Sequence, residues 1–325
     1  MKMKENYVDK EILEEIKKLM GYASKAGGTE EIEKPILVLA PKMKKPGKES
    51  TSLRVYAYGG ILGKIPTAKN KKGALMSKKY LKYLPENTEE KAKLEELLRN
   101  PKAQTREQRI DTLLSKEYLE LALEACRRRF AGKNGKPKER WIETDLIKKY
   151  LNNKDRWIPI DMEFAFPKQW MGDKEKCVRP DIVIYDKNAG AFRMIELKGN
   201  SKSCHGKSGL FEHYQDAMDI MISSHRNEII NECFRKMEYL YEYGIISGEA
   251  WKEVLDSTDR ENVDLKFGCF FIGGKLDTYQ KYVDRKLSCV KENCSFLYSP
   301  DIDTDILKNC QMLSYDEFMA YKEEA

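Results

Sequence analysis

The sequence lacks the features that would place it in several common classes of protein. Its eight cysteines include no pair spaced as Cys-x-x-Cys, so the usual spacing of a zinc site is absent. Cys126 and Cys233 lie in apolar helical patterns, where a cysteine usually acts as a small buried side chain. The N-terminus has no apolar signal core, and no run approaches the roughly 20 apolar residues needed to span a bilayer. We therefore expect a reduced, cytoplasmic protein that does not cross a membrane.

Acidic residues are nearly missing from one stretch of the chain. Between Pro41 and Pro85 there are twelve Lys and Arg residues and a single acid, Glu49, although the net charge of the whole chain is only +6. Phosphate backbones attract such a cluster through charge neutralisation and release of counterions. The segment therefore indicates a nucleic-acid partner, and a solvated basic loop is the alternative interpretation.

The chain is long for one simple domain, with 325 residues, 41% of them apolar and 34% charged. The tract Ala131–Lys138 has the Gly, Pro and charge of a linker. We expect an N-terminal α-rich region over residues 1–131, whose basic segment 41–85 serves DNA binding or dimerisation. A separate domain is expected over residues 138–325.

Hydrophobic periodicity gives the expected elements of the N-terminal region. Two short apolar segments, Pro35–Ala40 and Leu53–Tyr58, predict a hairpin with a long loop. Apolar residues at helical spacing predict three helices. These helices cover Tyr7–Ala23, Thr88–Leu98 and Thr105–Phe130.

The second half of the chain predicts an α/β core, a mixed sheet covered by helices. The expected strands are Ile158–Phe166, Asp181–Tyr185, Phe192–Lys198, Leu265–Ile272 and Ser295–Tyr298. The expected helices are Lys138–Tyr150, a long helical region from Leu210 towards Tyr243, Trp251–Leu255 and Tyr279–Leu287.

Charged residues at the ends of two neighbouring strands carry the chemistry. Strand side chains alternate between faces, so Glu196 and Lys198 share a face, and Asp181 opens the preceding strand. Charges in such apolar strands need partners or a metal ion. A divalent cation held by Asp181, Glu196 and the main-chain carbonyl of Leu197 would satisfy the carboxylates, and oxygen ligands favour Mg²⁺ or Mn²⁺. Lys198 would then orient the attacking water or stabilise the transition state.

Pro180-Asp181, fourteen intervening residues and Glu196-Leu197-Lys198 together resemble the signature of the PD-(D/E)XK nuclease superfamily. The resemblance implies a restriction-endonuclease-like core with a mixed central sheet. The helical patterns ahead of this core predict that it carries an N-terminal, mostly helical extension. It also implies a Mg²⁺-dependent nuclease in which Mn²⁺ can replace Mg²⁺. Members often add an acid from the preceding strand or helix, which leaves Glu163 and Glu143 as alternatives. A polar residue on the following helix often completes the site, and Gln215 is the candidate.

The expected activity is hydrolysis of phosphodiester bonds, as a DNA endonuclease of restriction or defence type. Double-stranded DNA is the expected partner, and a homodimer is expected if both strands are cut. Two alternatives remain: a non-catalytic nucleic-acid-binding module on the same fold, and a structural protein in which Asp181, Glu196 and Lys198 form a buried ion pair.

Overall fold

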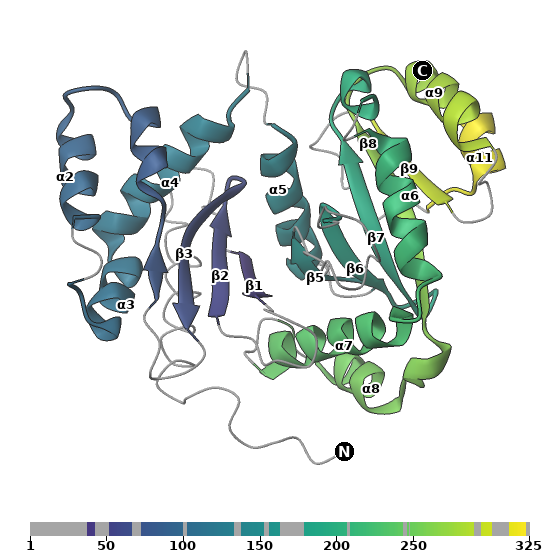
Figure 1. The fold of residues 1–325 in the computed structure, drawn as a ribbon, viewed down its shortest axis with the longest axis horizontal. Helices are drawn as coiled ribbons and strands as arrows, with labels where there is room; N and C mark the ends of the chain where they lie inside the picture. Colours follow the sequence, from purple (N-terminus) through teal and green to yellow (C-terminus); the bar gives the residue numbers. More distant parts are fainter. Residues whose placement is uncertain are drawn as a thin grey trace. The chain divides into compact units, whose positions relative to one another are not determined.

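The computed structural model divides the chain into two compact units, Met1–Lys148 and Lys149–Ala325. Figure 1 shows the first unit in purple to teal and the second in teal to yellow. The residues described are 38–42, 52–66, 73–99, 103–132, 138–152, 156–162, 179–206, 209–242, 246, 248–288, 294–300 and 312–322. The boundary falls inside helix α5 (Glu139–Asn152), which follows the expected linker. Within these ranges, no helix combines the length and the apolar character that a membrane span requires.

Unit 1 contains a four-stranded antiparallel sheet in the order β1 (Val38–Lys42), β2 (Ser52–Ala57), β3 (Gly60–Pro66) and β4 (Ala74–Leu75). The predicted pairing of the first two strands is confirmed, whereas β3 and β4 were not predicted. A two-residue turn joins β2 to β3, with positive φ at both Tyr58 (47°) and Gly59 (77°), as a type I′ hairpin requires. A Cβ atom at Gly59 would lie 2.7 Å from the carbonyl carbon of Arg140, so this position also needs glycine for space.

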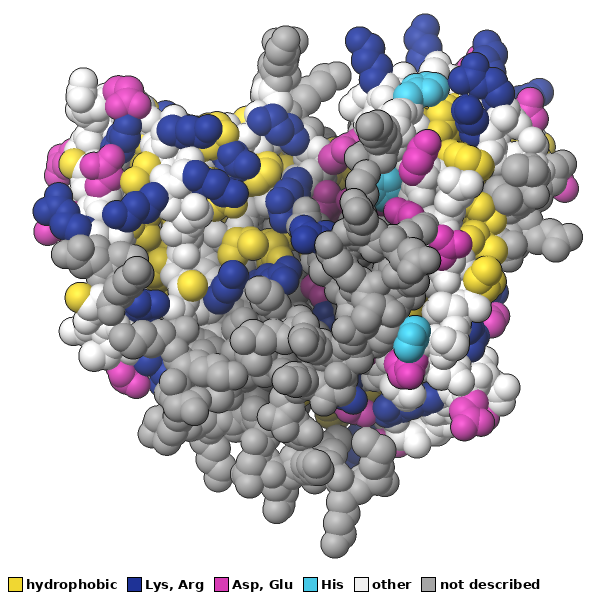
Figure 2. All heavy atoms as spheres, viewed as in Figure 1, with side chains coloured by type: hydrophobic (Ala, Val, Ile, Leu, Met, Phe, Trp, Pro, Cys, Tyr) yellow, Lys and Arg dark blue, Asp and Glu magenta, His cyan; other side chains and the backbone are white. Residues whose placement is uncertain are grey.

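The helical part of unit 1 comprises η1 (Lys78–Tyr83), α2 (Glu89–Leu97), α3 (Arg106–Leu114), α4 (Lys116–Phe130) and the first part of α5. The single helix expected over Thr105–Phe130 is wrong, because Ser115 is extended and separates α3 from α4. Its hydroxyl accepts a hydrogen bond from the backbone N–H of Tyr118, 3.2 Å away, and so caps the second helix. Figure 2 shows Lys and Arg side chains gathered on the visible face of this unit.

Tyr118 joins α4 to the sheet of unit 1. Its hydroxyl donates to the carbonyl of Leu62 in β3 (2.7 Å) and accepts from the N–H of Met76 just after β4 (2.8 Å). Complete burial raises the pKa of the Tyr118 hydroxyl far above its ordinary value, so this group stays a neutral donor. One side chain thus satisfies two buried backbone groups at once.

Unit 2 is built on a five-stranded mixed sheet in the order β5 (Trp157–Met162), β6 (Ile182–Asp186), β7 (Ala191–Lys198), β8 (Asp264–Ile272) and β9 (Cys294–Ser299). The pairs β5–β6 and β6–β7 are antiparallel, and the pairs β7–β8 and β8–β9 are parallel. This confirms the predicted α/β class and mixed sheet. The turn between β6 and β7 ends at Gly190, which adopts φ +57°.

Helices flank this sheet (Figure 1): α6 (Leu210–Met221), α7 (Arg226–Glu242), α8 (Glu249–Ser257), α9 (Leu276–Leu287) and α11 (Tyr315–Ala320). The ring of Phe234 on α7 lies between Tyr185 and Phe192, with centroid distances of 6.0 and 5.0 Å. Tyr214 on α6 packs edge-on against Phe267 of β8 at 5.7 Å. These contacts place α6 and α7 on the sheet face to which the even-numbered residues of β7 point.

Candidate active site

The end of the β6–β7 hairpin brings the motif residues together. Ile182 pairs with Ile195, so the antiparallel register, continued by one residue, sets Asp181 opposite Glu196. Residues directly opposite one another in an antiparallel pair project from the same face. Lys198 lies two residues beyond Glu196 and therefore projects from that face as well. The sequence pattern and the strand register therefore both place Asp181, Glu196 and Lys198 on one face of the sheet.

Glu196 is a buried carboxylate that faces two basic side chains. Only 2% of Glu196 and 4% of Lys198 are exposed. The Lys198 Nζ donates to Glu196 Oε1 over 2.6 Å, and His213 Nδ1 lies 3.0 Å from Oε2. Removing an ionised carboxylate from water is costly unless it is paired. Each oxygen of Glu196 therefore has a basic neighbour in the protein itself.

Asp181 is the more accessible of the two carboxylates. It precedes β6 and is half-buried, and its Oδ2 accepts a hydrogen bond from the backbone N–H of Leu197 over 2.8 Å. This bond anchors one oxygen of Asp181 to the strand that carries Glu196. The Leu197 side chain is fully buried and points to the opposite face of the sheet. Asp181 thus combines a fixed position with contact to solvent.

His213 is the residue of α6 that reaches Glu196, and the sequence did not single it out. The buried residues of α6 are Leu210, Tyr214, Ala217 and Ile220, and His213 lies within their stripe. Gln215, the residue expected on this helix, is exposed. At about 100° per residue, Gln215 lies roughly 200° around the helix from His213. A helical projection of residues 210–221 was therefore the signal that would have favoured His213 over Gln215.

The two candidates for a further acid are placed differently. Glu163 lies outside the described residues, one position after Met162, the last residue of β5. Met162 pairs with Ile182, the residue that follows Asp181. Glu143 is buried, with 4% exposure, on the part of α5 that belongs to unit 1. Glu143 is therefore not one of the residues of unit 2 that surround Asp181 and Glu196.

Cys269 of β8 lies beside Glu196 in the register of the parallel pair. Burial raises the pKa of the Cys269 thiol well above its usual value, and the neighbouring Cys294, Glu196 and Cys204 act in the same direction. Lys198 opposes this shift but does not outweigh it. A thiol in this state is a poor nucleophile, so Cys269 is not a candidate nucleophile of this site.

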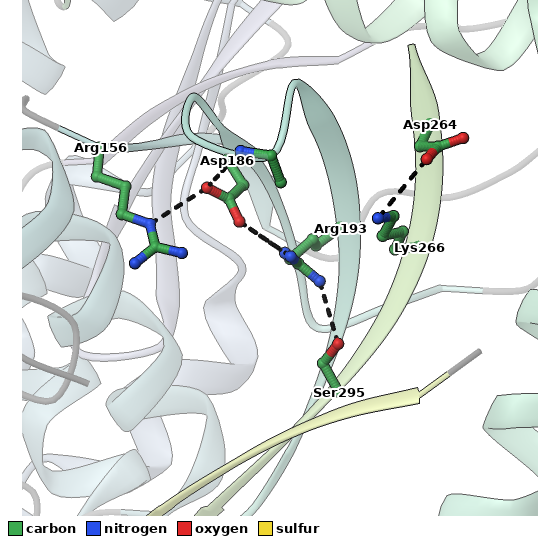
Figure 3. A network of polar contacts seen from close by, with 7 residues as sticks. Arg156, Asp186, Arg193, Asp264, Lys266 and Ser295 are labelled. Atoms are coloured by element: carbon green, nitrogen blue, oxygen red, sulfur yellow. Dashed lines mark hydrogen bonds and ion pairs between the residues drawn. The ribbon is translucent and has the colours of Figure 1, made fainter. Parts of the chain in front are cut away.

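A second buried carboxylate lies at the other end of the same two strands (Figure 3). Asp186 is fully buried, and its Oδ2 accepts hydrogen bonds from Arg193 Nε (3.1 Å) and Nη2 (3.0 Å). Its other oxygen lies 3.3 Å from Arg156 Nε, and Arg193 donates onward to the hydroxyl of Ser295 over 3.2 Å. This network has the features of a structural ion pair, in which planar guanidinium groups saturate the carboxylate.

The described residues contain no group of three or more His, Cys, Asp and Glu side chains placed to hold a metal ion. Asp181 and Glu196 are thus two oxygen donors whose remaining partners would be main-chain oxygen, water or residues outside the described ranges. Comparisons of the chain with protein-family models, with curated proteins and with solved structures find no match. The assignment of a function to this chain therefore rests on the geometry of these residues.

Proposed function

We propose that the chain is a divalent-metal-dependent nuclease of the PD-(D/E)XK type that hydrolyses phosphodiester bonds in DNA as an endonuclease. In this proposal, unit 2 is a restriction-endonuclease-like core. The observation that carries the proposal is the register of β6 and β7, which sets Asp181 opposite Glu196, with Lys198 Nζ 2.6 Å from Glu196. Two carboxylates can hold a divalent ion, and a lysine beside them can stabilise the charge that develops on the phosphate.

The residues present fit a Mg²⁺ ion. The donors are carboxylate oxygens, with the Leu197 carbonyl beside them in sequence, and Mg²⁺ prefers such oxygen ligands and keeps several of its waters. Asp181 is half-exposed, so an ion with bound water can be accommodated next to it. When bound, the ion would supply an activated water and neutralise charge on the scissile phosphate. Mn²⁺ has similar ligand preferences and is expected to replace it.

The side chains of unit 2 have separate tasks in this proposal. Asp181 and Glu196 hold the ion, and Asp181 is kept in place by its bond from the Leu197 N–H. Lys198 provides a cation next to the developing charge on the phosphate. His213 Nδ1 lies 3.0 Å from the second oxygen of Glu196, where it would help to orient that carboxylate. Glu163 remains the expected third acid. His213 takes the role of the polar residue on the following helix, for which the sequence had suggested Gln215.

The test uses the full chain with circular and linear duplex DNA, single-stranded DNA and RNA, in Mg²⁺, in Mn²⁺ and in EDTA. We expect cleavage of circular duplex DNA that requires the divalent ion. Asp181→Asn should abolish cleavage while leaving the fold intact, and Lys198→Met should abolish cleavage in a chain that is less stable but still folded at the assay temperature. Asp264→Asn is the matched control, because Asp264 is an exposed aspartate at the start of β8. Cleavage that persists in Asp181→Asn, or a wild-type protein that cuts none of these substrates, would overturn the proposal.

A non-catalytic nucleic-acid-binding module is the second candidate function. It is favoured by the bond between Lys198 and Glu196 Oε1, which compensates the charge of the buried carboxylate without a metal ion. Titration calorimetry separates the two candidates, because the nuclease must bind Mg²⁺ or Mn²⁺ through Asp181. Heat of binding that is lost in Asp181→Asn supports the nuclease. A chain that binds DNA but neither ion is the binding module.

A further inference from the structure

Unit 1 carries a cluster of cations that the proposed chemistry of unit 2 does not use. We call it the η1–α4 basic surface, and it consists of Lys78, Lys79, Lys82, Arg127, Arg128 and Arg129. The three lysines lie on η1 and the three arginines in the last turn of α4. All are exposed except Arg129, which is half-buried. The lysines belong to the basic segment that the sequence indicated, whereas the arginines lie more than forty positions later in the chain.

Aromatic rings lie beneath three cations of this surface, Lys79, Lys82 and Arg129. Arg129 lies over the rings of Tyr80 and Phe130, with its guanidinium carbon 5.1 and 5.0 Å from the centroids. Its Nη1 also donates to the hydroxyl of Tyr83 over 2.6 Å, which joins α4 to η1. Lys82 Nζ lies 5.3 Å from the centroid of Tyr83. Cations that are ordered in advance lose less freedom when an anion binds.

The surface stays positive after its internal ion pairs are counted. Glu124 is the carboxylate bound by these cations: it accepts from Arg127 at 2.8 and 2.9 Å and also pairs with Arg128. Both arginines remain exposed in these pairs. Exposed ion pairs contribute little to stability and are readily exchanged for another anion. Two of the six cations pair with Glu124, and the sum of these seven charged side chains is positive.

Interaction with the helix dipoles explains the positions of only some of these cations. Cations in the last turn of α4 interact favourably with the helix dipole, which accounts for the arginines. Lys78 and Lys79 lie in the first turn of η1, where the dipole disfavours positive charge. No acidic residue is present in that turn to offset them. The helix dipole therefore does not account for these two lysines, although Lys79 Nζ lies 5.6 Å from the centroid of the Tyr80 ring.

We propose that the η1–α4 basic surface binds the phosphodiester backbone of duplex DNA, and this identification of the ligand rests on the nuclease function proposed above. Polyanionic backbones match its charge. Single strands are usually bound by stacking bases on open aromatic rings. Here Tyr80 and Phe130 are only 5% and 6% exposed, and Tyr83 is covered by Arg129 and Lys82. The surface thus offers cations for phosphates and no free ring for an unpaired base.

The test measures binding separately from cleavage. The full chain carrying Asp181→Asn is titrated in EDTA with a fluorescent DNA duplex, and anisotropy is recorded over a range of salt concentrations. Adding Lys78→Gln, Lys79→Gln and Lys82→Gln should weaken binding by about eightfold per lost phosphate contact at about 0.1 M salt. The slope of log K against log salt should fall by about 0.9 for each lost contact.

A matched control removes the same charge from other parts of unit 1. It carries Lys93→Gln, Arg99→Gln and Lys116→Gln, at α2, just after it and at the start of α4. Binding by this variant should change less than threefold. Thermal unfolding monitored by circular dichroism checks that both triple variants fold. If the η1 variant does not fold, Arg128→Gln alone makes the same test, because Arg128 is exposed and its aliphatic stem is retained in part.

Each outcome bears on the proposal. A selective loss in the η1 variant, larger for duplex DNA than for single-stranded DNA or duplex RNA, supports it. Equal losses in the two triple variants would overturn it, because net charge alone would then govern binding. Unchanged affinity, or a loss confined to single strands or RNA, would overturn it as well. If the wild type binds duplex DNA through this surface but does not cut it, the binding proposal is supported and the nuclease proposal is contradicted. If the wild type cuts duplex DNA but the η1 variant binds it as tightly as the wild type does, the nuclease proposal is supported and the binding proposal is contradicted.

Discussion

Replacing Lys198 by methionine removes the charge that faces Glu196 while keeping a side chain of similar length. Both residues are almost fully buried, and their charged atoms are 2.6 Å apart. Removing one partner of a buried ion pair costs about 3–5 kcal/mol, because the other charge is left uncompensated. His213 still faces the second oxygen of Glu196, so we expect the lower end of this range, about 3 kcal/mol. For a domain the size of unit 2, this corresponds to a melting temperature lower by about 6–12 °C.

The response of the Lys198→Met protein to Mg²⁺ tests the metal site itself. A bound cation would supply the charge that the variant lacks, so its free energy of unfolding should rise more on addition of Mg²⁺ than that of the wild type. Urea denaturation followed by tryptophan fluorescence measures the free energies of unfolding of the wild type and the variant, in EDTA and in excess Mg²⁺. Trp157 and Trp251 are buried in unit 2 and report on its unfolding.

Two further variants control the reasoning. Lys266→Met removes a lysine from the neighbouring strand β8, where the side chain is 43% exposed and 3.6 Å from Asp264. Its cost should be below about 0.5 kcal/mol. Adding Glu196→Gln to Lys198→Met should restore most of the lost stability, because no uncompensated charge remains. If Lys198→Met is as stable as Lys266→Met, the buried pair does not behave as described. If Mg²⁺ stabilises Lys198→Met no more than the wild type, the proposed metal binding is contradicted.

Three other predictions concern groups outside the site. Tyr118→Phe leaves the buried carbonyl of Leu62 without its donor and should cost about 1–3 kcal/mol in urea denaturation; a cost near zero would contradict this. Burial raises the pKa of Glu232 above 4.5, so its contribution to the stability of the wild type should be lost as pH rises from 4.5 through the raised pKa. Over that pH range the free energy of unfolding of Glu232→Gln should rise relative to that of the wild type, which denaturation at several pH values measures. Burial raises the pKa of Cys126 and Cys233 to about 12, so neither should react with a thiol reagent at about pH 8 until the chain is denatured; rapid labelling of the native protein would refute their burial.

The sequence was sufficient to predict the geometry of the β6–β7 strand end. Residues alternate between the faces of a strand, and a short turn closing at Gly190 fixes the register of the hairpin. Once Ile182 pairs with Ile195, the positions of Asp181 and Glu196 on one face follow directly. The mixed sheet was predictable for a related reason, because apolar runs such as Leu265–Ile272 are typical of buried strands.

Other features depended on tertiary contacts that a single sequence does not display. The strand β3 contains Gly60 and Gly63 and lacks a clean alternation, yet a Cβ at Gly63 would lie 2.7 Å from Leu113, so the glycine reflects close packing against α3. The break at Ser115 depends on one local hydrogen bond that competes with continuing the helix. His213 was overlooked because its residue type alone gave no signal, and only its position within the apolar stripe of α6 distinguishes it from Gln215.

The two buried carboxylates of the β6–β7 hairpin differ in the chemistry of their partners. Asp186 is held by Arg193 and Arg156, whose guanidinium groups stay charged and fix the carboxylate through a rigid fork. Glu196 is held instead by a lysine and a histidine, a point charge on a flexible stem and an imidazole. A lysine and a histidine constrain the carboxylate less than a guanidinium fork does, and in the proposed function they would leave more freedom for a metal ion at the carboxylate oxygens. The half-exposed Asp181 stands only at the Glu196 end. Adaptable partners and an accessible second carboxylate are therefore the physical reason for assigning function to that end of the hairpin and structure to the other.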